Sequence, residues 1–280
     1  MKTFSKFNFP VAIMIATLLF VSCEKNDPAT EPEAEPEPKP KPEWVGDRPG
    51  KIPGLGNTRG EPTGTPFHLP DGIETAGRIM GGYDPANYYQ SAGKRDSLPY
   101  TEFIRTETVW TRAAGDTVRV DTIAGSGMLH VQIFIPLKNT TSQDISVTFP
   151  AGLIMKAVTG ACQNGLLLKK TTVDVPARGF CGVLLIMYCG NEDLSQSLTT
   201  EEYVFTVVSN SSLIMDLCER VKNKRINMEE YPPGRHGYTD SEQYHDYVFQ
   251  LQDMVWKLTD RGEPLSKEDI AFIEQMENSH

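Results

Sequence analysis

The stretch CGVLLIMYC, from Cys181 to Cys189, decides how the rest of the sequence is interpreted. Every residue from Val183 to Met187 within it is apolar, so neither parity of the run would offer a polar face to water. A short apolar run of this kind is typical of a strand that is covered on both faces. We therefore expect Cys181–Cys189 to be a central strand.

Shorter segments with a period of two precede this strand and predict an antiparallel sheet. They are Thr117–Ile123, Met128–Ile135 and Ile145–Phe149, with Leu153–Met155 and Gly165–Val175 as further strands. About seven short strands separated by turns are typical of a sandwich or a barrel, and of the two we predict an antiparallel β-sandwich. Pro176–Gly179 should join Gly165–Val175 to the central strand as a hairpin, which would set Cys189 opposite residue 166.

The residues after Asn191 change to a helical pattern, in which Glu201–Val208 fits either a last strand or a linker. The main helix is Ser241–Thr259 (SEQYHDYVFQLQDMVWKLT), with an N-terminal capping box from Asp240 and Gln243 or from Thr239 and Glu242. Its apolar stripe comprises Tyr244, Val248, Leu251, Val255 and Leu258.

Two further helices are expected on either side of the main one. Asn210–Ser212 can cap the first, and Ser266 with Asp269 forms a capping box for the second. Each helix has one apolar face to bury, and the strands are its available partner. We therefore predict an α+β fold in which residues 201–280 form a helical cap on a sandwich of residues 67–200, as one composite unit.

The first residues have the features of an export signal. Lys2 and Lys6 precede the apolar run Val11–Val21, which is too short for a permanent membrane anchor. The run ends at Ser22-Cys23, which resembles the lipobox of bacterial lipoproteins, and the loose match is common in Bacteroidetes lipoproteins. This resemblance implies a signal peptide of residues 1–22 and a lipid-carrying Cys23; a plain secretory signal with an incidental Cys is the alternative.

A tether follows, which we assign to residues 23–66. Asp27–Glu43 (DPATEPEAEPEPKPKPE) contains Pro and charge with nothing to bury, so it should be disordered and extended, reaching about 50 Å at ~3.1 Å per residue. The charged Glu24–Asp27 resembles the export tag that sends some Bacteroidetes lipoproteins to the outer face. We therefore expect an outer-membrane protein that is held by its lipid and faces outward.

The charge of the chain excludes one class of partner. A formal net charge of −10 disfavours nucleic acid and electrostatic binding to anionic lipid. The expected partners are the membrane, through the lipid, and a host or matrix protein or a glycan. The five His have no metal-ligand spacing, and the sequence has neither a phosphate-binding Gly-rich loop nor a G-x-S-x-G elbow. We predict no metal, no cofactor and no enzymatic activity; a secreted hydrolase is the remaining alternative.

Four cysteines follow Cys23 in the sequence: Cys162, Cys181, Cys189 and Cys218. Residues 181 and 189 of one straight strand would lie about 26 Å apart at ~3.3 Å per residue, too far for a disulfide. In the predicted hairpin Cys162 comes close to Cys189, so these two could form a disulfide. Cys218 lies beside a helix stripe and could be buried as a small apolar residue.

Tyr188-Cys189, followed later by the helical Leu251-Gln252-x-x-Val255-Trp256, resembles the thioester domains of bacterial surface adhesins. The resemblance covers roughly residues 149–276, and Gly190 departs from it because that family prefers an apolar residue after the Cys. It implies an internal thioester between Cys189 and Gln252, shielded by Tyr188 and Trp256, that captures a host or matrix amine. The alternatives are a hydrogen-bonded Gln252, a packing Trp256 and a free or disulfide-bonded Cys189, in a non-covalent binding module.

Overall fold

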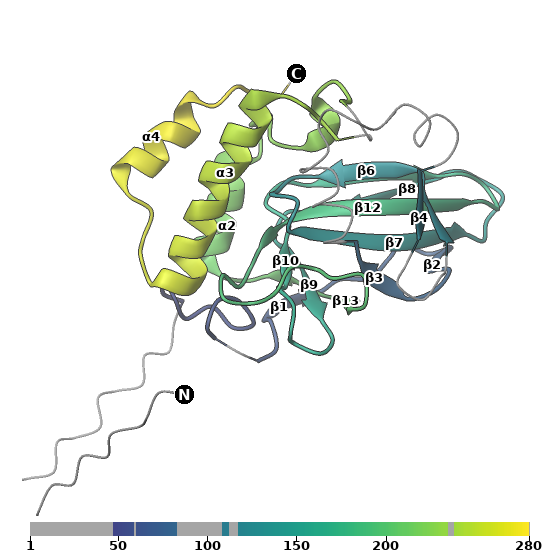
Figure 1. Ribbon diagram of the computed structural model, residues 1–280, viewed down its shortest axis with the longest axis horizontal. Coiled ribbons are helices and arrows are strands. Elements are labelled where there is room, and N and C mark those ends of the chain that lie inside the picture. Colours follow the sequence, from purple (N-terminus) through teal and green to yellow (C-terminus); the bar gives the residue numbers. More distant parts are fainter. Residues whose placement is uncertain (1–46, 59, 83–107, 112–116, 235–237, 280) are drawn as a thin grey trace, which may run out of the picture. The chain divides into compact units, whose positions relative to one another are not determined.

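A computed structural model of the chain describes residues 47–58, 60–82, 108–111, 117–234 and 238–279 (Figure 1). The signal peptide, Cys23 and the Pro-rich run up to Glu43 lie outside the described residues. Among the helices in these ranges, none combines the length and the apolar character that crossing a membrane requires.

The predicted central strand is confirmed. It is β12 (Phe180–Cys189), and every residue in it after Phe180 is buried. On one side β12 pairs antiparallel with β7 (Val131–Asn139). On its other side lie β6 (Thr122–Gly125), which runs parallel to it, and the short antiparallel β10 (Gly165–Leu166).

The prediction of a β-sandwich was wrong, because the sheet closes on itself into a six-stranded antiparallel barrel. The ring runs from β12 through β10, β9, β13, β3 and β7 back to β12. The members not yet given are β9 (Leu153–Ala157), β13 (Glu202–Ser209) and β3 (Ile79–Gly81). The helices therefore pack against a closed barrel and not against one sheet of a sandwich.

The ring is closed by two strands, β3 and β13, that the sequence pattern did not identify. β3 is only three residues long and precedes the region in which strands were expected. β13 falls on the segment that could have been a strand or a linker, and it bridges β9 and β3. Period-two alternation reports only that one face of a strand is buried, so it does not distinguish a sandwich from a closed ring.

The remaining strands extend the ring or form separate pairs. β1 (Gly64–Pro66) pairs with β13, and β2 (Ile73–Thr75) pairs with β7. The two separate pairs are β4 (Thr108–Thr111) with β5 (Thr117–Val120), and β8 (Ile145–Phe149) with β11 (Thr171–Val175).

The predicted hairpin between Gly165–Val175 and the central strand is only half right. Gly165 does lie opposite Cys189, one residue from the expected register. Residues 171–175 instead pair with β8, because the chain leaves the ring after Leu166.

The helices lie together on one side of the strands, and the unit that contains them runs from Val45 to His280 (Figure 1). They are α2 (Ser212–Val221), the 3₁₀ turn η1 (Met228–Glu230), α3 (Glu242–Trp256), the π-helical turn η3 (Lys257–Arg261) and α4 (Lys267–Gln275). The predicted capping box of α4 is confirmed, with Ser266 and Asp269 bonding reciprocally. The boxes predicted for α3 were wrong, because Ser241 is its N-cap and accepts from the Tyr244 N–H.

The alternation of β12 divides the core into two clusters. The helix-side cluster joins Ile186 and Tyr188 of β12 to α2 and α3. The barrel-side cluster joins Met187 and Cys189 to the other ring strands. Because successive side chains of a strand point to opposite faces, β12 contributes to both.

The chain before β1 forms a folded segment, Asp47–Thr58, which we call the strap. It belongs to the stretch that we assigned to the tether, yet Ile52 and Leu55 within it are buried in the helix-side cluster. Gly50 N–H donates to Leu258 O at 2.7 Å, so the strap lies against η3, the turn that follows α3. Two buried apolar side chains, together with hydrogen bonds along the segment, dock the strap.

Candidate functional site

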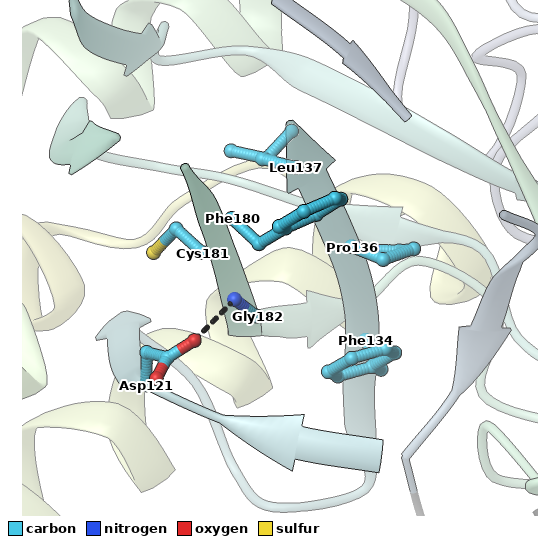
Figure 2. A pocket seen from close by; sticks show the side chains of 7 residues that line it. All are labelled: Asp121, Phe134, Pro136, Leu137, Phe180, Cys181 and Gly182. Carbon is cyan, nitrogen blue, oxygen red and sulfur yellow. Dashed lines mark hydrogen bonds between the residues drawn. The ribbon is translucent and has the colours of Figure 1, made fainter. Parts of the chain in front are cut away.

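A shallow hollow of about 290 Å³ lies over the outer faces of β7 and β12. Figure 2 shows Phe134 and Pro136 on β7, and Phe180 and Gly182 on the neighbouring β12, with the Phe180 ring reaching toward β7. Phe180 is 62% exposed. Asp121 is the one carboxylate of the lining, and it accepts from Gly182 N–H at 2.8 Å. The hollow therefore offers an apolar surface and not a set of converging reactive groups.

The second candidate is the contact between Cys189 and Gln252, and the structure brings these two residues together. Cys189 N–H donates to Gln252 Oε1 at 2.8 Å, and Gln252 Nε2 donates to Cys189 O at 3.0 Å. Both residues are fully buried. The Gln252 amide is thus held by the backbone of the same residue whose thiol the thioester hypothesis invokes.

The position of Gln252 depends on β7 being shorter than β12 at this edge, where Val131 is the first residue of β7. The last β7 partner of β12 is Val131, opposite Met187, so Cys189 extends beyond β7. Gly190 N–H donates to Asn164 O on the β10 side, and successive backbone groups of a strand alternate in direction. The N–H and C=O of Cys189 therefore point to the β7 side of β12, at a level that β7 does not reach. There the Gln252 amide takes the place of a strand residue.

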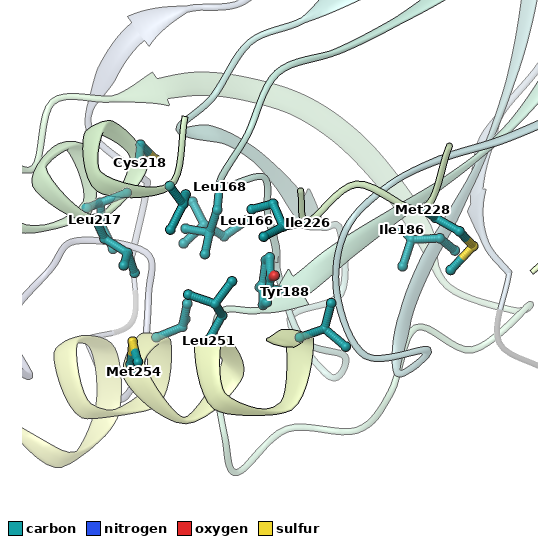
Figure 3. Packing of buried hydrophobic residues seen from close by; sticks show 14 of the residues in the cluster. Leu166, Leu168, Ile186, Tyr188, Leu217, Cys218, Ile226, Met228, Leu251 and Met254 are labelled. Carbon is teal, nitrogen blue, oxygen red and sulfur yellow. The ribbon is translucent and has the colours of Figure 1, made fainter. Parts of the chain in front are cut away.

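Tyr188 and Trp256 lie on different sides of β12. The Tyr188 ring is fully buried in the helix-side cluster with Leu251, as Figure 3 shows, whereas the Cys189 side chain belongs to the barrel-side cluster. Tyr188 is therefore on the opposite face of β12 from the thiol. Trp256 packs on the barrel-side cluster, so of the two predicted shielding residues it is the one on the thiol's side.

The electrostatic surroundings keep the Cys189 thiol protonated. Burial raises the pKa of this thiol far above its ordinary value, and the nearby Asp260 carboxylate raises it further. Asp260 is itself half-buried, and desolvation raises the pKa of its carboxyl group. The thiolate is the nucleophile in acyl transfer, so burial holds the Cys189 thiol in its unreactive, protonated form.

All four cysteines in the described residues are free and buried. Cys162 is the predicted disulfide partner of Cys189. Its backbone forms an isolated parallel β-bridge with Ser195, and it lies outside β10. Burial raises the pKa of its thiol, with a smaller contribution from Glu201. Cys218 is buried on α2, as its place beside the helix stripe predicted.

The strap completes this region, and sequence reasoning missed its role. Gly56 N–H donates to Gly190 O at 2.6 Å, and Asn191 Nδ2 donates to Gly56 O at 2.9 Å. A Cβ on Gly190 would come within 2.7 Å of Leu55 Cδ2. The Gly at position 190, which departs from the thioester-domain pattern, thus leaves room here for the Leu55 side chain of the strap. Leu55, isolated among Gly and Pro, was the available sequence signal.

Metal-binding groups do not assemble in the part of the chain that the structure describes, where no three side chains of His, Cys, Asp or Glu gather in a suitable cluster. Comparisons with models of protein families, with curated proteins and with solved structures found no match. The likeness to thioester domains therefore rests on the residues quoted above.

Proposed function

We propose that this chain is a lipid-anchored binding module of the outer membrane, facing outward, that attaches to a host or matrix protein or a glycan without acting as an enzyme. The observation that carries the proposal is the order of parts: Ser22-Cys23 after an apolar leader, a Pro-rich tether, and then a folded unit that begins at Val45. A tether of this composition would hold the barrel clear of the membrane surface.

The anchor is tested by expressing the full chain in a Bacteroidetes host that is fed an alkynyl fatty acid. We expect the chain to carry the label and the Cys23→Ala variant to lose it. Proteinase K added to intact cells should remove the barrel. An unlabelled wild-type chain, or a barrel that is protected until the cells are broken, would contradict the anchor or the outward orientation respectively.

The geometry favours a non-covalent module, because Gln252 already has a structural role. Its amide satisfies two buried backbone groups of Cys189, and burial holds the Cys189 thiol in its protonated form. In this form the ligand binds without forming a bond to Gln252.

One observation favours the covalent form as a second candidate: the Gln252 amide lies against Cys189, with Trp256 on the thiol's side of the strand. In that reaction the sulfur of Cys189 bonds to Cδ of Gln252, the C–N bond breaks, and ammonia leaves with the thiol proton. Intact mass of the purified chain separates the two forms. The thioester lowers the mass by about 17 Da, and Cys189→Ala abolishes this difference. A mass equal to that of the free residues would refute the covalent form.

A further inference from the structure

The strap connects three parts of the fold that are distant in the sequence. Asp47 Oδ2 accepts from Leu213 N–H at the start of α2, at 3.4 Å. Gly50 bonds to Leu258 beyond the end of α3, and Gly56 bonds to Gly190 at the end of β12. The strap therefore fastens the helices to the barrel at the point where the chain enters the folded unit (Figure 1).

Close approach of backbones makes this fastening specific. Gly56 has φ +59°, and a Cβ there would lie 1.7 Å from Thr259 O. Asn164 Nδ2 donates to Gly54 O at 2.8 Å, in a buried position. These contacts are short and directional, so the strap has one seated position and loses its contacts once it moves by a few ångströms.

The strap is nevertheless held less extensively than the longest strand pair of the ring. Its apolar anchors are Ile52 and Leu55, and its hydrogen bonds follow one another along the chain from Asp47 to Thr58. The β7–β12 pair alone runs in register from Phe180 to Met187. Tension that enters at Asp47 reaches the strap contacts first and one at a time, before it reaches β1, β2 and the ring strand β3.

We propose that the strap is a mechanical latch, which tension on the tether releases before any ring strand opens. Release frees Gly190 O and Leu258 O and removes Leu55 from its place over Gly190, next to the Cys189–Gln252 pair. The source of tension, a lipid anchor at one end and a bound ligand at the other, rests on the proposed function. The latch itself is a property of the folded unit.

Single-molecule force spectroscopy tests the latch on the chain from Glu24 onwards, which lacks the signal peptide and Cys23. One handle is attached at the N-terminus and the other through Ser142→Cys in the exposed turn between β7 and β8, so that neither α4 nor the C-terminus is loaded. We expect a first small step before global unfolding. At about 3.5 Å per residue the extended strap is roughly 40 Å long. The expected gain in contour length is this value less the distance that the seated strap already spans.

Matched variants assign this step to the strap. Leu55→Ala should shorten the lifetime of the latched state at constant force by at least about tenfold, because truncating a buried Leu removes its contacts. Ile73→Ala, a comparable truncation in β2, should leave the first step unchanged and weaken only the later one. Thr58→Val, which removes a hydroxyl that donates to Gly50 O, is a milder variant with an expected effect of a few-fold.

Global unfolding without a preceding step would overturn the latch, and so would a first step that neither Leu55→Ala nor Thr58→Val alters. These outcomes are independent of the anchor. A chain without lipid label can still show the step, and a lipid-labelled chain can lack it.

Discussion

Gln252 and Cys189 form a reciprocal pair of hydrogen bonds, at 2.8 and 3.0 Å, that ties α3 to the end of β12 across 63 residues of sequence. The Gln252 carboxamide presents an N–H donor and a C=O acceptor on the same edge, as the N–H and C=O of one strand residue do. Gln252 can therefore replace a strand residue at the place where β7 has ended. The pair is first of all a joint between the helices and the barrel.

Gln252→Ala should destabilise the fold by about 2–5 kcal/mol. The change leaves the buried N–H and C=O of Cys189 without partners, at about 1–3 kcal/mol each, and opens a cavity. Chemical unfolding in urea measures the effect. Gln250→Ala, on the exposed face of the same helix, is the control and should change the free energy of unfolding by less than about 0.5 kcal/mol. Equal effects of the two variants would show that the joint does not contribute to stability.

Gly190→Ala should destabilise the fold by about 1–3 kcal/mol, because the new methyl group would overlap Leu55. Combining it with Leu55→Ala should recover part of this loss, giving a favourable coupling energy in a double-mutant cycle. Thermal unfolding of the four proteins provides the measurement. Gly77→Ala, whose Cβ would meet no atom within 4 Å, is the matched control. Simple additivity of the two changes would argue against a direct contact.

Lys169→Ala should cost about 3–5 kcal/mol, since it removes one partner of a largely buried ion pair. Lys169 Nζ donates to Glu230 Oε1 at 2.6 Å, and its side chain is only 10% exposed. It also donates to Lys224 O and to Ser279 Oγ, so it holds the C-terminal residues. Lys170→Ala, the exposed neighbour, should be close to neutral in the same unfolding assay. A loss below about 1 kcal/mol for Lys169→Ala would contradict this role.

Alkaline solution should destabilise the protein through its thiols. Burial raises the pKa of all four cysteines in the described residues, to about 12 for Cys218. Below the unfolded-state value of about 8.5 both states hold the proton, so the thiols cause no change with pH. Above it the unfolded chain ionises first, and stability falls by up to about 1.4 kcal/mol per pH unit for each thiol.

Urea unfolding at pH 7.5, 8.5 and 9.5 measures this slope. Cys218→Ala should reduce the slope, because one of the buried thiols no longer titrates. A free energy of unfolding that stays constant up to pH 9.5 in the wild-type protein would contradict the burial of these groups.

Local patterns predicted the elements well. The apolar run of β12, the alternation of β8 and the Ser266–Asp269 box each concern neighbouring residues, and each is confirmed. The meeting of Cys189 and Gln252 was predicted through a resemblance, because no local pattern encodes a contact across 63 residues. The sequence did not predict that the Gln252 amide would bond to the Cys189 backbone, because this contact depends on how far β7 extends along β12.

The barrel and the strap could not be predicted for the same physical reason. Closure depends on β3 and β13, whose pairing is decided by distant strands and not by their own composition. The strap has the Gly and Pro content of a linker, and only Ile52 and Leu55 reveal that it docks. Composition describes what a segment can do alone, whereas burial depends on the surface that it meets.

The strap also sets the order in which the chain can fold. It is the first part of the folded unit to be synthesised, yet its partners, Gly190 and Leu258, lie far downstream in the sequence. Loop closure over such separations is slow, and contacts of this range form late. The chain must therefore have left the ribosome or the export channel as far as Leu258 before the strap can form all of its contacts. Until then Leu55 and the surface that it covers are exposed to chaperones and to neighbouring chains.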